Sequence, residues 1–103
     1  MLVKTVSFND FLEEFIRYGR ADSFSYKAKK ALYNYLNELS DDIGEPIELD
    51  VIGLCGEFTE YDSIEEFNHD YSYTIDEINS IDEIEYYTTV IRIDDERFII
   101  QDF

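Results

Sequence analysis

EFTEYDSIEEFNHDYSYTIDEINSIDEIE, residues 57–85, is the stretch on which the fold of this chain depends. Eleven of its 29 residues are Asp or Glu, and none is Lys or Arg. Acidic segments of this kind usually stay disordered because they lack large apolar side chains. This segment carries ten of them: Phe58, Tyr61, Ile64, Phe67, Tyr71, Tyr73, Ile75, Ile78, Ile81 and Ile84. We therefore predict that it folds and presents a rigid, negatively charged surface.

The charge of the whole chain is unusual in amount and in distribution. We expect the 103 residues to form a single domain, 1–103, and they carry a formal net charge of −17. Soluble domains of this size usually carry a net charge of about 2 to 8 in magnitude. Residues 1–30 have a net charge of +2, whereas residues 31–103 have a net charge of −19. An even acidic coat that serves solubility is the alternative interpretation, and this uneven distribution argues against it.

Composition excludes several classes of partner and compartment. Phosphate groups attract Lys and Arg, so the acidic region is not expected to bind nucleic acid or an anionic membrane directly. No apolar run approaches the roughly 18 residues of a membrane span, and the start of the sequence, Met1–Val6, is too short and too quickly polar for a signal peptide. The single cysteine, Cys55, cannot form an internal disulfide. Together these features predict a cytoplasmic protein.

Two amphipathic helices are expected in the N-terminal half. The first spans residues 7–18, where Ser7 and Asp10 have the spacing of a capping box. The second spans residues 25–42, and Gly44 is placed to end it. In both segments apolar residues recur at i, i+3, i+4 and i+7, the pattern of one helical face.

The rest of the chain carries strand patterns and signals for short helices. Strands are expected at about residues 2–6, 48–57, 86–93 and 97–103, the last two paired as a hairpin. Ser63 and Thr74 each precede a Glu by three residues, which is again the spacing of a capping box, so short acidic helices are expected after both. These elements indicate an α+β fold, with an antiparallel sheet of three to four strands, two longer N-terminal helices and short acidic helices.

We expect a non-enzymatic protein without a cofactor or a metal site. Carboxylates are so abundant that no pair stands out as a general acid and base. His69, the single histidine, is expected on the surface, and Cys55 is expected to be a buried, inert thiol on an interior strand. The acidic triplet 94–96 lacks the ligand pattern of a calcium loop, and the sequence has no Gly-rich phosphate loop.

The acidic stretch itself is the candidate partner-binding surface. Carboxylates at i and i+3 or i+4 of a helix lie about 5–6 Å apart, and each strand of duplex DNA carries one phosphate per roughly 3.4 Å of axis. The two charge densities are comparable, so a folded row of carboxylates could imitate a phosphate backbone. Tyrosine is frequent in binding hot spots and stacks on arginine. The residues expected to bind a partner are Glu57, Glu60, Asp62, Glu65, Glu66, Asp70, Asp76, Glu77, Tyr61, Tyr71 and Tyr73.

Several segments resemble a family of small acidic proteins found in bacteriophage and prophage genomes. They are Leu49–Tyr61 (LDVIGLCGEFTEY), Ser63–Phe67 (SIEEF), Tyr87–Ile91 (YTTVI) and Phe98–Phe103 (FIIQDF). The resemblance covers about residues 47–103 and implies a phage origin. It includes no catalytic motif, so it assigns no functional residue. In overall character the chain is also similar to DNA-mimic inhibitors, namely anti-CRISPR and anti-restriction proteins.

The resulting hypothesis is a phage-encoded inhibitor that occludes the basic nucleic-acid-binding site of a host defence protein, such as a CRISPR effector or a restriction enzyme. Three alternatives remain open: an immunity-type inhibitor of a basic enzyme without DNA mimicry, a small phage enzyme or regulatory protein, and a domain that associates with a second copy of itself. An ordered array of exposed acids would favour the inhibitor, whereas a closed pocket lined by Cys55 or His69 would favour an enzyme.

Overall fold

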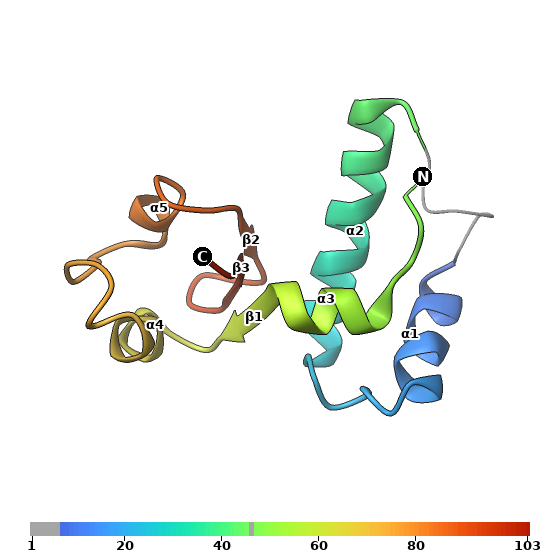
Figure 1. Cartoon of the computed structure of the whole chain (residues 1–103), viewed down its shortest axis with the longest axis horizontal. Helices are drawn as coiled ribbons and strands as arrows, with labels where there is room; N and C mark the ends of the chain where they lie inside the picture. The colour runs from blue at the N-terminus through green and yellow to red at the C-terminus, as the bar shows by residue number, and fades with distance from the viewer. Residues whose placement is uncertain (1–6, 46) are drawn as a thin grey trace. The chain divides into compact units, whose positions relative to one another are not determined.

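The computed structural model describes residues 7–45 and 47–103 (Figure 1). Along these residues the chain forms helices and strands in the order α1-α2-α3-β1-α4-α5-β2-β3, and the strands make one antiparallel sheet. This confirms the α+β class. The chain divides into two compact units, Met1–Glu57 and Phe58–Phe103, which are described separately. The strand expected at residues 2–6 lies outside the described residues, and the expectation of a single domain stays a prediction.

The first helix of the N-terminal unit, α1 (Phe8–Arg17), begins where its capping signal predicts. The Ser7 hydroxyl accepts a hydrogen bond from the Asp10 backbone N–H at 3.1 Å, and the Asp10 carboxylate accepts one from the Ser7 N–H at 3.2 Å. These two bonds complete a capping box. Phe11 and Phe15, one turn apart, are fully buried, which confirms the predicted apolar face.

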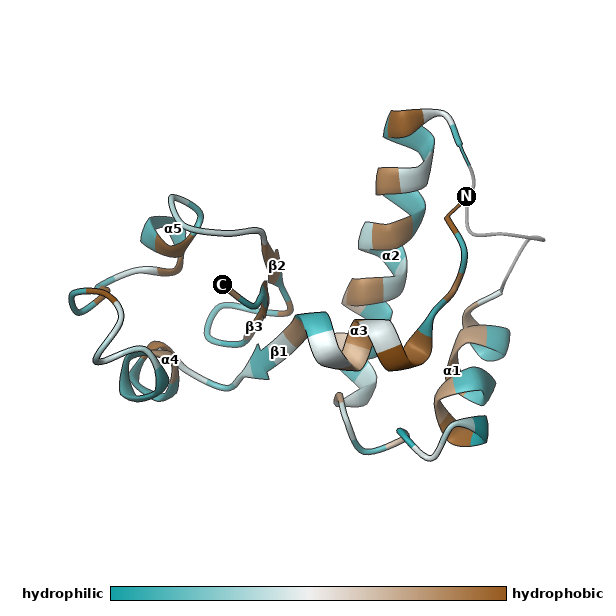
Figure 2. Cartoon of the chain, viewed as in Figure 1, coloured by the Kyte–Doolittle hydropathy of each residue, from teal (hydrophilic) through white to brown (hydrophobic). Residues whose placement is uncertain are grey.

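The second helix, α2 (Tyr26–Ile43), also lies close to its predicted bounds. The Ser25 hydroxyl caps its start, and Gly44 ends it with a φ of 73°, a left-handed conformation that suits glycine. Bands of apolar and polar residues alternate along the helix (Figure 2). Lys29 is only 8% exposed, because its ammonium group turns inward and donates to the Ala21 carbonyl.

The segment after α2 is a helix and not the strand expected at residues 48–57. This helix, α3 (Val51–Glu57), is capped by the preceding residue, Asp50. The carboxylate and the carbonyl of Asp50 accept backbone N–H groups of the first turn. The two buried residues of the helix, Val51 and Leu54, lie three positions apart on one helical face. The apolar run that resembled an interior strand is therefore a short helical stripe.

The C-terminal unit is built on a three-stranded antiparallel sheet in the order β1-β3-β2. Its strands are β1 (Phe58–Tyr61), β2 (Val90–Arg92) and β3 (Phe98–Gln101). Strands β2 and β3 form the expected hairpin, although each is shorter than its predicted range of 86–93 or 97–103. Strand β3 pairs with a neighbour on each side, and its first three residues are buried.

The hairpin turn is fixed by Asp94. Its carboxylate accepts hydrogen bonds from the backbone N–H of Arg97, from the Nε of Arg97 and from the backbone N–H of Glu96, at 2.8, 2.8 and 3.0 Å. These bonds, the one from the Arg97 backbone first, lower the pKa of Asp94 to about 2. One of the three acidic residues of the turn therefore stabilises it by accepting hydrogen bonds from the turn's own backbone.

Two short helices complete the C-terminal unit. Helix α4 (Ile64–Asp70) begins after Ser63, whose hydroxyl accepts a backbone N–H of the first turn, as the sequence predicts. The helix expected after Thr74 does not form: the described residues 75–80 are not helical, and α5 (Ile81–Ile84) begins after Ser80.

Apolar residues from all these elements form one core in the C-terminal unit. Ile64, Tyr71, Ile75 and Val90 pack around its edge. The buried members are Tyr61, Phe67, Ile78, Ile81, Ile84, Phe98 and Ile100. The ring of Phe67 on α4, which is fully buried, lies within 6.1 Å of the rings of Tyr61, Tyr71 and Phe98, measured between ring centroids.

Asn68 explains why the chain is not helical near Ile78. The side-chain Nδ2 of Asn68 donates to the Ile78 carbonyl, and its Oδ1 accepts from the Ile78 N–H, each at 2.8 Å. This pair of bonds occupies both backbone groups of Ile78, as a neighbouring strand would. A helix that began after Thr74 would need the same groups for its own hydrogen bonds.

Replacing Asn68 by alanine tests this contact. In Asn68→Ala the N–H and carbonyl of Ile78, a residue that is 5% exposed, lose their side-chain partners. An unsatisfied buried polar group costs about 1–3 kcal/mol, so we expect the free energy of unfolding to fall by that amount in urea titrations followed by circular dichroism. His69→Ala, at an exposed neighbour on α4, is the control, with an expected change within about 0.5 kcal/mol. Equal midpoints for the two variants would contradict the assignment.

Candidate acidic interface

The C-terminal unit carries most of the negative charge of the chain. It contains fourteen Asp or Glu residues and two Arg residues, a formal net charge of −12. Thirteen of these acidic residues are exposed, and the remaining one, Glu60 on β1, is half-buried. The acidic stretch is thus a folded body whose carboxylates lie around an apolar core.

Five of the exposed carboxylates also accept hydrogen bonds within the unit. Asp70 accepts from the hydroxyl of Tyr61 at 2.9 Å, and Asp82 forms an ion pair with Arg92. These internally bonded carboxylates are Asp70, Asp82, Glu83, Asp94 and Asp102. They stabilise the unit, so they are less available to an outside partner.

Eight other exposed carboxylates form no side-chain hydrogen bond or ion pair with the described residues. They are Asp62, Glu65, Glu66, Asp76, Glu77, Glu85, Asp95 and Glu96. Helix α4 has seven residues, which at about 1.5 Å per residue makes it roughly 10 Å long. A row of carboxylates that imitates phosphates therefore cannot lie on one helix, and it has to continue through residues 71–80 and α5.

The acidic residues predicted to bind a partner differ in their surroundings. Asp62, Glu65, Glu66, Asp76 and Glu77 are all exposed in the C-terminal unit. The other three predicted acids are less simple: Glu57 is exposed but belongs to the N-terminal unit, Glu60 is half-buried on a strand, and Asp70 is bonded to Tyr61.

The three tyrosines predicted to bind a partner also differ. Tyr61 is 4% exposed and belongs to the core, so its ring is not part of an accessible surface. Tyr71 is half-buried and stacks on Phe67 and Phe103. Tyr73 is fully exposed. The sequence pattern missed this difference because the burial of Tyr61 follows from the pairing of β1 with β3.

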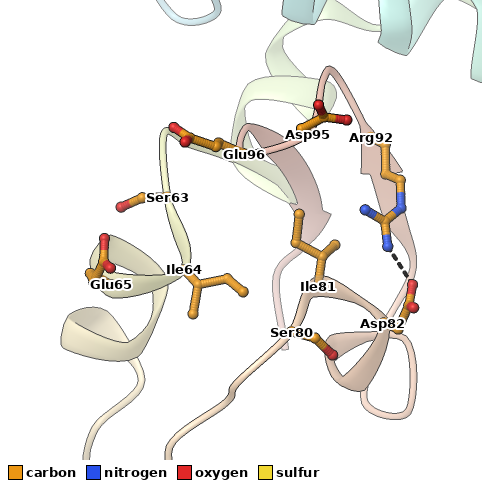
Figure 3. Close-up of a pocket in the computed structure, with 9 residues that line it drawn as sticks. All are labelled: Ser63, Ile64, Glu65, Ser80, Ile81, Asp82, Arg92, Asp95 and Glu96. Atoms are coloured by element: carbon orange, nitrogen blue, oxygen red, sulfur yellow. Dashed lines mark hydrogen bonds and ion pairs between the residues drawn. The ribbon is translucent and has the colours of Figure 1, made fainter.

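A hollow of about 470 Å³ lies between the starts of α4 and α5 and the hairpin turn (Figure 3). Ile64 and Ile81 contribute apolar surface to it, and the guanidinium of Arg92 turns toward Asp82 (Figure 3). Its full lining is Ser63, Ile64, Glu65, Ser80, Ile81, Asp82, Arg92, Asp95 and Glu96, with a formal net charge of −3. Sequence reasoning missed this hollow, since its three segments meet only in the folded chain.

The two residues considered for enzymatic chemistry lie outside this hollow. His69 is exposed on α4, as predicted. Cys55 is half-exposed on α3, which corrects the prediction of a buried thiol on an interior strand, because the strand is a helix. Within residues 7–45 and 47–103 no cluster of three or more His, Cys, Asp or Glu residues is arranged to hold a metal ion.

Comparisons of the chain with protein-family models, curated proteins and solved structures found no match. The resemblance to small acidic phage proteins therefore stays a prediction. In the part of the chain that the structure describes, no helix is both long enough and apolar enough to cross a membrane.

The buried hydroxyl of Tyr61 makes stability depend on alkaline pH. Burial, and then the hydrogen bond to Asp70, raises the pKa of Tyr61 well above its usual value of 10.0. Above about pH 10 the unfolded chain releases this proton while the folded chain retains it. Stability is therefore complete below pH 10 and falls as the pH rises further.

Tyr61→Phe should make this alkaline decrease in the free energy of unfolding shallower. At pH 7 the variant should also lose about 1 kcal/mol, the typical contribution of one hydrogen bond. Urea titrations at pH values between 8 and 12 measure both effects. Tyr73→Phe, at a fully exposed position, is the control and should follow the wild type. If Tyr61→Phe and the wild type lose stability equally above pH 10, the assignment is wrong.

Proposed function

We propose that the protein is a phage-encoded, non-enzymatic inhibitor that acts in the host cytoplasm. It occludes the basic nucleic-acid-binding site of a host defence protein by DNA mimicry, and the expected type of target is a CRISPR effector or a restriction enzyme. The observation that carries the proposal is the concentration of charge: thirteen exposed acidic residues on one folded unit.

The two arginines of the unit do not offset this charge toward a partner. Arg92 is paired with Asp82 and Arg97 with Asp94, so both guanidinium groups are engaged within the unit. The remaining carboxylates create a negative potential that attracts a basic surface over about one Debye length, roughly 8 Å at physiological salt. Such a potential mainly accelerates encounter and selects partners of opposite charge.

An immunity-type inhibitor of a basic enzyme would use the same surface, and DNA competition separates the two functions. If the protein occupies a nucleic-acid site, duplex DNA must displace it from its partner. We therefore expect a partner captured from host lysate at low salt to be released by duplex DNA. A partner that holds DNA and this protein together, without loss of affinity for either, would refute the proposal.

Charge reversal on α4 tests which carboxylates make the contact. Glu65→Lys with Glu66→Lys should weaken binding to that partner roughly tenfold, because each exposed ion pair contributes up to about 1 kcal/mol. The matched control is Glu13→Lys with Glu38→Lys, which changes the net charge equally at exposed positions of the N-terminal unit. The control should retain most of the affinity, and thermal unfolding verifies that both variants fold.

Salt dependence provides the second readout for the same variants. Wild-type affinity should fall steeply between about 0.05 and 0.5 M salt, over which the Debye length shrinks roughly threefold. The α4 double variant should show a smaller salt slope than the control. Equal wild-type affinity at both salt concentrations would contradict an electrostatic mechanism.

A further inference from the structure

A row of stacked rings runs from the core of the C-terminal unit to its surface. The ring centroids of Phe67 and Tyr71 are 4.7 Å apart, those of Tyr71 and Phe103 4.6 Å, and those of Phe103 and Tyr87 5.8 Å, with interplanar angles of 23°, 15° and 7°. Tyr86 meets Tyr87 edge-on at 5.3 Å. We call these five residues, Phe67, Tyr71, Phe103, Tyr87 and Tyr86, the aromatic ladder.

Exposure increases along the aromatic ladder. Phe67 is fully buried, Phe103 and Tyr87 are 44% and 42% exposed, and Tyr86 is 88% exposed. Aromatic side chains bury about 150–250 Å² each when they are covered. The outer end of the ladder therefore leaves a large aromatic surface accessible beside a packed core.

Backbone contacts hold this outer end in place. The Tyr87 N–H donates to the Ile84 carbonyl at 2.9 Å, and the Thr88 hydroxyl donates to the Gln101 carbonyl at 2.7 Å. The Gln101 N–H in turn donates to the Thr89 carbonyl at 3.0 Å. The segment before β2 is thus tied both to α5 and to β3. A partner that covers these rings has little chain to order, which lowers the entropic cost of binding.

Carboxylates lie next to the exposed rings. Glu85 precedes Tyr86 and Tyr87 in the chain and lines an open hollow of about 520 Å³ with them and residues 88–90. Asp102 precedes Phe103, but its carboxylate already accepts a hydrogen bond from Thr59, so Glu85 is the carboxylate available to pair with a cation. An aromatic face beside carboxylates matches a guanidinium group, which stacks on the ring and pairs with the carboxylate. A nucleobase would stack equally well, but its phosphates would be repelled.

We propose that Tyr86 and Tyr87, supported by the ring of Phe103 behind them, form a stacking site for an arginine side chain of a basic partner protein. The inference rests on the proposed function, because it names the part of the acidic unit that distinguishes arginine from lysine. Lysine is a compact, strongly hydrated charge, whereas the planar guanidinium is weakly hydrated and stacks on aromatic faces. The carboxylates attract both cations, and the exposed rings favour arginine.

Binding of nona-arginine and nona-lysine to the whole protein, measured by isothermal titration calorimetry at low salt, tests the site without knowledge of the natural partner. We expect arginine to bind about two- to fivefold more tightly at equal charge, the ratio of an exposed cation–π contact. In nitrogen-15 spectra, the backbone signals of Tyr86, Tyr87 and Phe103 should shift more with nona-arginine.

Tyr86→Leu should abolish the preference for arginine, because it lowers the affinity for nona-arginine more than the affinity for nona-lysine. The residue is 88% exposed, so the variant should fold like the wild type. Tyr18→Leu, at a tyrosine of the N-terminal unit that is 50% exposed and outside the predicted interface, is the matched control and should keep the preference.

Three results would overturn the stacking site: equal affinity for the two peptides, a preference that survives Tyr86→Leu, or oligothymidylate that binds at the same residues. Equal, salt-sensitive affinity for both peptides would remove the stacking site and leave the proposed inhibitor intact. An arginine preference in a protein that DNA does not displace from its partner would support the stacking site and remove the DNA-mimic function.

Discussion

Repulsion between like charges is the constraint that the C-terminal unit has to satisfy, and the core around Phe67 is what satisfies it. Thirteen exposed carboxylates surround a cluster in which Phe67, Ile84, Phe98 and Ile100 are completely buried. Burial of such a side chain contributes about 1.5–3 kcal/mol, whereas repulsion between solvated charges is weak and screened by salt. Burial of these side chains therefore offsets the repulsion: α4, α5, β1 and β3 each place buried residues in the cluster, and Val90 of β2 packs against it.

The same constraint explains how several carboxylates are used. Asp94 accepts the backbone N–H groups of its own turn, Asp70 accepts the Tyr61 hydroxyl, and Asp82 pairs with Arg92. In each of these contacts a charged carboxylate also accepts a hydrogen bond that joins two parts of the unit. The carboxylates without such contacts, on α4 and in residues 76–77 and 95–96, lie where solvent accepts them. An acidic surface of this kind contains both structural and available carboxylates.

Local signals predicted α1, α2, α4 and the hairpin correctly, whereas α3 was predicted as a strand and the helix predicted after Thr74 does not form. Ser7 and Ser63 cap helices because capping needs residues only three positions apart. The short apolar run at residues 51–55 of α3 fits a strand or a helix equally well by periodicity, and the cap at Asp50 separates the two. The helix expected after Thr74 does not form because Asn68 binds the backbone of Ile78. These two residues lie ten positions apart, which is beyond the reach of a local sequence pattern.

The candidate site was predictable to the same extent. The exposure of Glu65, Glu66 and Glu77 could be predicted from the sequence, because burying an unpaired charge is costly in any fold. The burial of Tyr61 and the stacking of Tyr71 on Phe103 join residues that are far apart in the chain, so they required the structure.

In the proposed function, charge and stacking supply different parts of recognition. A surface made of carboxylates alone attracts every basic protein, because long-range attraction does not distinguish arginine from lysine. Specificity is a difference between affinities, and it needs a contact that one partner makes and another lacks. The exposed rings of Tyr86 and Tyr87 sit beside Glu85 on the same unit that carries the charge. If the protein is the proposed inhibitor, the carboxylates account for the rate and range of attraction, and the rings account for a choice among the basic surfaces that are attracted.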